Sequence, residues 1–271
     1  MPPGAQEDTK YEKICYQSRS RTFCSLFLVS CAYHDALPKA AEDAAAAFAA
    51  AEETEKWEEK GETETTKAPV RAPVYPPLEQ AQLEVENILQ LPHLPNGCEV
   101  VSLAIVLQYH FNIDMDPVWL SDNYLPKGPF DQVNPESTYV GDPKGEGFGC
   151  YVPCLQVTAG LYMHEAGYLD YAANNLTGSS MEELEAWVAG GTPVILWATV
   201  DMEPSVVARE WKVDGYTVRW FSGSHCVVLS GYTEDKSIIC DPLKGVVEYD
   251  RQDVIDAYEL VGRRAMVLYQ P

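Results

Sequence analysis

The chain has 271 residues, of which 46% are hydrophobic and 22% charged, an ordinary composition for a globular protein. Its formal net charge is -22. This acidity argues against a nucleic-acid groove, which needs a basic stripe, and against binding to an anionic membrane surface. No apolar run is as long as the roughly 18 residues that a membrane-spanning helix requires, so none is predicted.

Residues 1–31 have the order of a secretory signal. Arg19 and Arg21 precede a short apolar stretch, and Leu28-Val-Ser-Cys31 resembles the lipobox of bacterial lipoproteins. We therefore expect export, with lipidation of Cys31 anchoring the protein at the cell surface. The segment ahead of the apolar stretch is long and carries acidic residues, so a cytoplasmic protein without a signal is the alternative.

Residues 32–78 differ sharply in composition from residues 79–271. Residues 39–60 are rich in alanine and glutamate, and residues 61–78 are polar and interrupted by prolines. The first segment consists of strong helix formers but has few apolar side chains to bury, and the second has the composition of a linker. Together they predict a tether of low order. It is either a plain tail or a spacer that holds a domain away from a surface. The folded domain is expected over 79–271, a length that supports a proper core.

Cys98 stands where an apolar helix is predicted to begin. Two prolines and a glycine between residues 92 and 97 keep the preceding segment out of a helix, and from Val100 apolar residues recur at i, i+3, i+4 and i+7. A thiol on the first turn lies close to free backbone N–H groups and the positive end of the helix dipole. Both favour the thiolate and lower the pKa of a cysteine nucleophile. A buried structural cysteine is the alternative.

The remaining pattern places helices first and strands later, which is typical of an α+β domain and not of alternating βαβ units. We expect the helix of Cys98 to pack on an antiparallel sheet. The Gly- and Pro-rich stretch 126–153 is predicted to be a long irregular loop. The expected elements in chain order are helices over 98–110, 114–124 and 180–188, a strand over 193–200, a hairpin of 226–230 with 237–240, and a strand over 264–269.

His225 and Asp241 lie at the two ends of the predicted hairpin. Facing residues of an antiparallel hairpin have a constant sum of numbers, so one register pairs His225 with Asp241 and Cys226 with Cys240, on opposite faces. A carboxylate opposite an imidazole fixes its tautomer and stabilises the imidazolium. A core histidine and an Asp-Pro turn are the alternative interpretations.

Four blocks of sequence, taken together, resemble the C39-like peptidases of bacteria, stand-alone relatives of the bacteriocin-leader peptidase domain. The resemblance covers residues 80–271 and implies a papain-like cysteine peptidase fold. It also implies that Cys98 is the nucleophile, His225 the general base and acid, and Asp241 the residue that orients the imidazole. Gln90 and the backbone N–H of Cys98 would hold the oxyanion. The blocks are Gln90-Leu-Pro-x-Leu-Pro-x-Gly-Cys98-Glu99, Gly191-Thr-Pro-Val-Ile-Leu-Trp197, His225-Cys-Val-Val-Leu-x-Gly-Tyr232 and Asp241-Pro-x-x-Gly245.

The expected activity is hydrolysis of peptide or related amide bonds in a peptide or protein substrate, through a thioester intermediate. The leader peptidases of the wider family are fused to transporters and cut after a double glycine. This chain has no transporter, so that substrate is not implied. A papain-like transpeptidase or acyltransferase, and a non-catalytic cell-surface binding module, are the alternatives. The sequence leaves the oligomeric state open.

The remaining cysteines do not suggest a metal site. Cys150 and Cys154 have no second pair at ligand spacing after them, so we expect neither a metal nor another cofactor. In an exported protein these two cysteines could form a disulfide. Cys226 and Cys240 could cross-link the hairpin, with buried free thiols as the alternative.

Overall fold

The structure is a computed structural model and describes residues 79–271. The predicted signal over 1–31, including Cys31, and the predicted tether over 32–78 lie outside the described residues. In the described part of the chain, no helix is both long enough and apolar enough to cross a bilayer.

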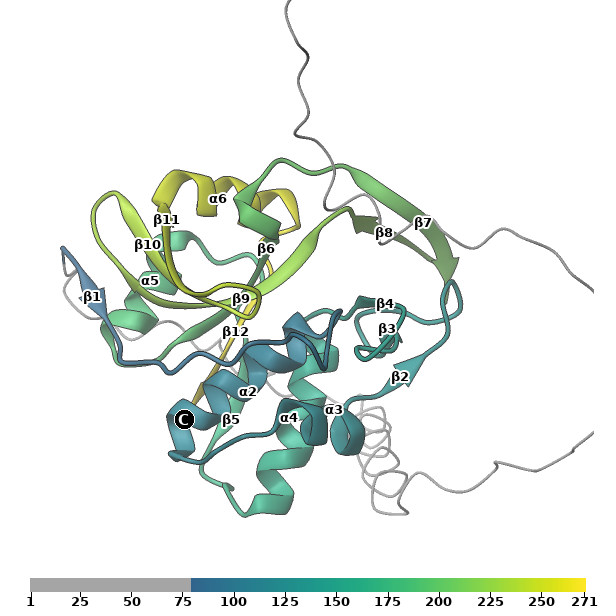
Figure 1. Cartoon of the computed structure of the whole chain (residues 1–271), viewed down its shortest axis with the longest axis horizontal. Helices are drawn as coiled ribbons and strands as arrows, with labels where there is room; N and C mark the ends of the chain where they lie inside the picture. Colours follow the sequence, from purple (N-terminus) through teal and green to yellow (C-terminus); the bar gives the residue numbers. More distant parts are fainter. Residues whose placement is uncertain (1–78) are drawn as a thin grey trace, which may run out of the picture. The chain divides into compact units, whose positions relative to one another are not determined.

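The centre of the domain is a seven-stranded sheet in the order β11-β10-β9-β6-β12-β5, in which β1 also pairs with β9 (Figure 1). Every pairing in this sheet is antiparallel. This confirms the expected antiparallel sheet. Its strands are β1 (Ala81–Gln82), β5 (Ala172–Asn175), β6 (Val194–Thr199), β9 (Ser224–Tyr232), β10 (Lys236–Asp241), β11 (Gly245–Asp250) and β12 (Ala265–Tyr269).

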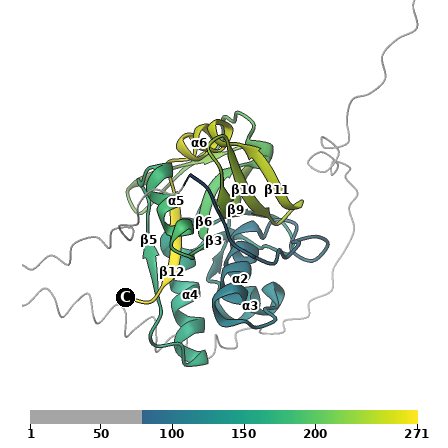
Figure 2. The same ribbon diagram turned by 90° about the vertical axis from the view of Figure 1, so that its left-hand side faces the viewer.

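Helices cover both faces of the sheet, as Figures 1 and 2 show. Side chains of β6 alternate between two cores: Ile195 and Trp197 belong to one, and Val194 and Leu196 to the other. The first core is packed by α2, α3 and α4, and the second by α5 and α6. The helices are α2 (Cys98–Phe111), α3 (Pro117–Tyr124), α4 (Val152–Ala166), α5 (Met181–Ala189) and α6 (Arg251–Leu260).

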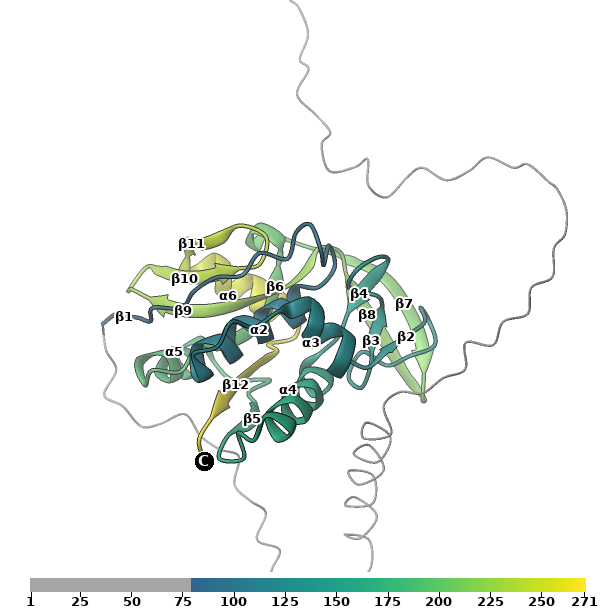
Figure 3. The same ribbon diagram turned by 60° about the horizontal axis from the view of Figure 1, so that its bottom comes forward.

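Helix α2 is the central helix of the first core. It begins at Cys98, as predicted, and all of its residues from Cys98 to Leu107 are buried. An apolar helix that is buried on every side must lie inside the domain, and in Figure 3 α2 runs between the sheet and helix α4. The α+β architecture predicted from the sequence is therefore confirmed, and its most buried helix carries Cys98 at its first position.

The stretch 126–153 is more ordered than predicted. It contains a small three-stranded sheet, β2 (Lys127–Gly128), β3 (Tyr139–Gly141) and β4 (Gly147–Gly149), and its last two residues begin helix α4. The prediction of an irregular loop was wrong in these places. Strands of two or three residues carry no readable periodicity, and a proline in the first turn starts a helix as readily as it interrupts one.

A second hairpin, β7 (Val207–Val213) with β8 (Tyr216–Phe221), leaves the sheet between β6 and β9 (Figure 1). It was not predicted from the sequence. Its turn is Asp214-Gly215, with both residues at positive φ, which is a strong short-range hairpin signal.

The β9–β10 hairpin forms, but the predicted register is wrong by two residues at Cys240 and by three at Ser237. Cys240 lies opposite Val228 and not opposite Cys226, and the register shifts at a bulge between Ile238 and Ile239. The turn is centred one residue later than expected, because Thr233 N–H donates to the Lys236 carbonyl at 2.8 Å and closes the loop there. The shift is two residues at Ile239 and Cys240, which leaves the side chains at that end of the hairpin on their original faces.

Candidate active site

His225 and Asp241 form a buried hydrogen-bonded pair, as predicted. The distance from His225 Nε2 to Asp241 Oδ1 is 2.8 Å, and the two residues are 2% and 1% exposed. The two-residue shift of register makes them diagonal neighbours instead of facing residues, which still allows contact. A carboxylate that accepts from Nε2 leaves Nδ1 as the nitrogen able to take up a proton.

Two further groups donate hydrogen bonds to Asp241. The Leu243 backbone N–H donates to Oδ1 at 2.7 Å, and the Tyr249 hydroxyl donates to Oδ2 at 3.4 Å. Burial alone would raise the pKa of Asp241, but the bonds from His225, Leu243 and Tyr249 outweigh it and lower that pKa. Asp241 is therefore a carboxylate near neutral pH, which suits a group that orients an imidazole.

Helix α2 is fastened to β9 at Cys226, the residue after His225. Ser102, one turn after Cys98, donates to the Cys226 carbonyl at 3.0 Å. The Cys226 backbone also makes a hydrogen bond with the Cys98 sulfur. The thiol therefore lies beside the strand position next to the histidine. Within residues 79–271, however, no hydrogen bond joins the thiol to the His225 ring.

The thiol of Cys98 instead donates to Glu99 Oε2, at 3.4 Å from sulfur to oxygen. Cys98 is 7% exposed. Burial, the charge of Glu99 and the nearby Cys226 thiol raise the pKa of Cys98 well above its ordinary value. The expected lowering of this pKa was wrong for the structure described, because burial and an adjacent carboxylate outweigh the hydrogen bond from the Cys226 backbone, which lowers it.

Gln90 lies beside the Asp241 turn, since its backbone N–H donates to the Pro242 carbonyl at 2.8 Å. Its side chain is 4% exposed, and Nε2 donates one hydrogen to the Pro95 carbonyl at 2.9 Å. The amide retains a second N–H. Gly97, which precedes α2, provides no side-chain cap, so the backbone N–H of Cys98 is not bonded by a capping side chain.

Sequence reasoning missed two residues of this site as functional candidates. Glu99 is buried in the first turn of α2, where a carboxylate within an apolar helix is itself a signal of a buried polar site. Tyr249 has no such signal, because only the pairing of β10 with β11 brings its hydroxyl to Asp241.

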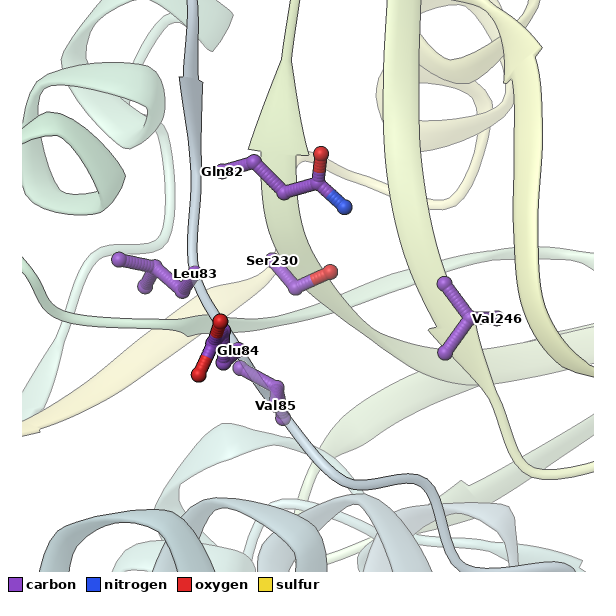
Figure 4. Close-up of a pocket in the computed structure, with 6 residues that line it drawn as sticks. All are labelled: Gln82, Leu83, Glu84, Val85, Ser230 and Val246. Carbon is purple, nitrogen blue, oxygen red and sulfur yellow. The ribbon is translucent and has the colours of Figure 1, made fainter.

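All five cysteines of the described residues are free and buried, so the structure contains neither of the two disulfides considered from the sequence. No group of three or more His, Cys, Asp or Glu side chains among residues 79–271 could hold a metal ion. A surface cavity of about 390 Å³ lies apart from the residues described above (Figure 4). It is lined by Gln82, Leu83, Glu84, Val85, Ser230 and Val246.

Known proteins resemble this chain in sequence and in structure. YvpB, an uncharacterised protein of Bacillus subtilis strain 168, is 28% identical over 190 residues, which are 67% of this chain and 72% of YvpB. The crystal structure of a candidate C39-like peptidase from Bacillus anthracis is 31% identical, with a TM-score of 0.63. The match covers 71% of this chain and 98% of that one.

The family match spans the whole described domain apart from its ends. The model of the Peptidase_C39 like family matches residues 80–266, which include every residue of the site described above. With the agreement in fold, this shows that the chain belongs to the Peptidase_C39 like family.

Proposed function

We propose that the protein is a cysteine peptidase that hydrolyses peptide or related amide bonds, with Cys98 as nucleophile. The observation that carries the proposal is the buried His225–Asp241 pair at 2.8 Å, in which His225 lies on β9, the strand that accepts a hydrogen bond from Ser102 of α2. A nucleophile, a base and a group that orients the base are the set that acyl transfer requires.

In the proposed first step, His225 Nδ1 takes the proton of the Cys98 thiol while sulfur attacks the substrate carbonyl. Asp241 stabilises the imidazolium that forms. The oxyanion accepts hydrogen bonds from the free backbone N–H of Cys98 and from the second N–H of Gln90 Nε2. His225 then gives its proton to the leaving amine, the C–N bond breaks and a thioester remains.

Hydrolysis of the thioester uses the same groups in reverse. His225 takes a proton from water as the water oxygen attacks the thioester carbonyl. The C–S bond then breaks and the proton returns to sulfur, which restores the thiol. Because the pKa of Cys98 is raised, the resting enzyme holds a thiol and His225 acts as a general base during attack.

The experiment is peptide-library profiling with the full chain and Cys98→Ala. We expect cleavage by the unaltered protein and none above background by Cys98→Ala. Cys154→Ala is the matched control, because Cys154 is also a buried free thiol but lies in α4 and outside the proposed site. Equal cleavage by Cys98→Ala, or its loss in both variants, would contradict the assignment.

Localisation is a separate proposal that rests on the sequence. The lipobox-like Leu28-Val-Ser-Cys31 supports lipidation of Cys31 and a place at the cell surface. The mass of the protein purified from its own cells tests this proposal. An intact N-terminus without lipid, in protein recovered from the cytoplasm, would refute it.

A further inference from the structure

Glu99 is a buried carboxylate in direct contact with the proposed nucleophile. It is 2% exposed, and its two oxygens have different partners. Oε2 accepts from the Cys98 thiol at 3.4 Å, and Oε1 accepts from the Cys150 backbone N–H at 3.0 Å. The proposed mechanism assigns no step to this group. A buried carboxylate is costly unless it is paired, so its place beside the sulfur needs an explanation.

The chain approaches Glu99 so closely at Gly149 that only glycine fits there. Gly149 has a φ of +138°, and a Cβ at this position would lie 2.0 Å from Glu99 Oε1. Cys150 is itself fixed, because its carbonyl accepts from Trp197 Nε1 at 2.9 Å. The carboxylate is thus held between the β4–α4 segment and Cys98, with one oxygen directed to the thiol.

The contact opposes ionisation of the thiol. A carboxylate that accepts the S–H bond stabilises the protonated sulfur, and its charge repels a thiolate. The opposite holds when Glu99 is protonated, because its O–H can then donate to a thiolate. Burial raises the pKa of Glu99 to about 7, so both forms of Glu99 are populated near neutrality.

We propose that Glu99 is a positioning residue that holds the resting Cys98 thiol protonated and away from His225, and releases it when Glu99 takes up a proton. On release, Glu99 gains a proton from water, and its O–H can then donate to the sulfur as the thiol proton passes to His225 Nδ1 during attack. The role of Cys98 as nucleophile rests on the proposed function. The effect of Glu99 on the ionisation of the thiol does not depend on that role.

The other titratable groups around Glu99 do not supply a competing charge near neutral pH. Burial raises the pKa values of Cys150 and Cys226, which therefore stay protonated. It likewise raises the pKa of Tyr139 and that of Tyr151, the latter to about 12.

Two charged groups lie further out. Arg264 lies over the Tyr151 ring at 3.7 Å and is paired with Glu136 at 2.9 Å. His225, on β9 next to Cys226, and its hydrogen-bond partner Asp241 are the remaining titratable groups at the site. The inference therefore concerns Glu99, Cys98 and His225.

The test is the pH dependence of Cys98 alkylation by iodoacetamide in the full chain, with mass spectrometry of the peptide that contains Cys98 as the readout. Glu99→Gln keeps an oxygen for the Cys150 N–H and places an N–H donor at the sulfur. We expect the alkylation midpoint to fall by at least about one pH unit, which is about tenfold faster labelling below the midpoint. Glu185→Gln, the same change at a buried carboxylate paired with Arg251, should leave the midpoint unchanged.

An unchanged or higher midpoint in Glu99→Gln would overturn the inference. If circular dichroism shows that this variant does not fold, the alkylation titration of the unaltered protein tests the inference instead. A coupled carboxyl and thiol titrate in two steps, one of them near pH 7, whereas a single step would refute the coupling. Failure of the peptidase proposal is recognised separately, as absent cleavage together with a lowered midpoint.

Discussion

The two ends of helix α2 each carry a titratable side chain that is buried or partly buried, but in opposite surroundings. At the first turn, Glu99 has a thiol and a backbone N–H as partners. At the last turn, His110 lies against aromatic rings, with centroids 5.3 Å from Tyr109 and 5.5 Å from Tyr171. Its Nε2 is buried and has no hydrogen-bond partner within residues 79–271.

The electrostatic consequences also differ. Burial raises the pKa of Glu99 to about 7 and lowers that of His110 to about 4, so in each case burial favours the uncharged form of the side chain. Only the first end combines this shift with polar contacts to the proposed nucleophile. A perturbed pKa therefore marks a functional position when the group has chemical partners, and otherwise records the cost of burial.

The largest expected effect separates the two ends by activity. His225→Ala removes the proposed base, and we expect kcat/KM for a peptide substrate to fall by about a hundred- to ten-thousand-fold. His110→Phe removes a histidine at the other end of the same helix and should leave kcat/KM unchanged. Similar losses of kcat/KM in both variants would show that the first end of α2 is not distinguished from the last end by a role in activity.

The next effect concerns stability at the first turn. The folded pKa of Glu99 lies above its unfolded value, so between about pH 4.5 and 7 the folded state binds more protons. The contribution of Glu99 to the free energy of unfolding should therefore fall as pH rises through this window, by up to about 3 kcal/mol. Urea denaturation of Glu99→Gln should lack this decline. An identical decline in the variant would assign it to other groups.

At the last turn the sign is reversed. The folded pKa of His110 lies below its unfolded value, so stability is fully present above about pH 6.5 and is lost as pH falls toward 4. Because the ring is only partly buried, we expect a loss of up to about 2 kcal/mol. His110→Phe should be less sensitive to acid than the unaltered protein, as measured by urea denaturation. Equal sensitivity would show that the ring is accessible to protons.

The smallest effect tests the support of Asp241. Tyr249→Phe removes a 3.4 Å hydrogen bond to Oδ2 and leaves the bonds from His225 and Leu243 in place. We expect a few-fold decrease in kcat/KM, equivalent to about 1 kcal/mol, with little change in stability. A loss as large as that of His225→Ala would mean that Tyr249 has a direct role in the reaction.

Local signals in the sequence were sufficient for several elements. Helix α5 begins at Met181, directly after Ser180 of its capping box, and Asp116 caps α3 ahead of Pro117. The contact between His225 and Asp241 was also predictable, because it depends on which face of a strand a residue occupies and not on its exact partner.

What was not predictable depends on tertiary structure. The later turn moved the register by three residues at Ser237, and the bulge after Ile238 reduced this shift to two at Cys240; no local pattern signals either feature. The pKa of Cys98 was predicted from the helix terminus alone, whereas burial and Glu99 determine its direction. The position of Tyr249 beside Asp241 likewise arises only from strand pairing.

The β7–β8 hairpin leaves the sheet after Thr199 and returns at Ser224, and these two residues are already paired across β6 and β9. The sheet is therefore complete without the hairpin, and His225 keeps its register whatever the hairpin's length. The hairpin in turn packs on the segment beside Glu99, where Tyr151 donates to the Arg219 carbonyl at 3.2 Å. The hairpin is nonetheless part of the first core, where its Trp211, Val218 and Trp220 side chains are buried, whereas its Asp214-Gly215 turn is exposed. Its packing against the core therefore constrains its strands, but the sheet does not constrain its length.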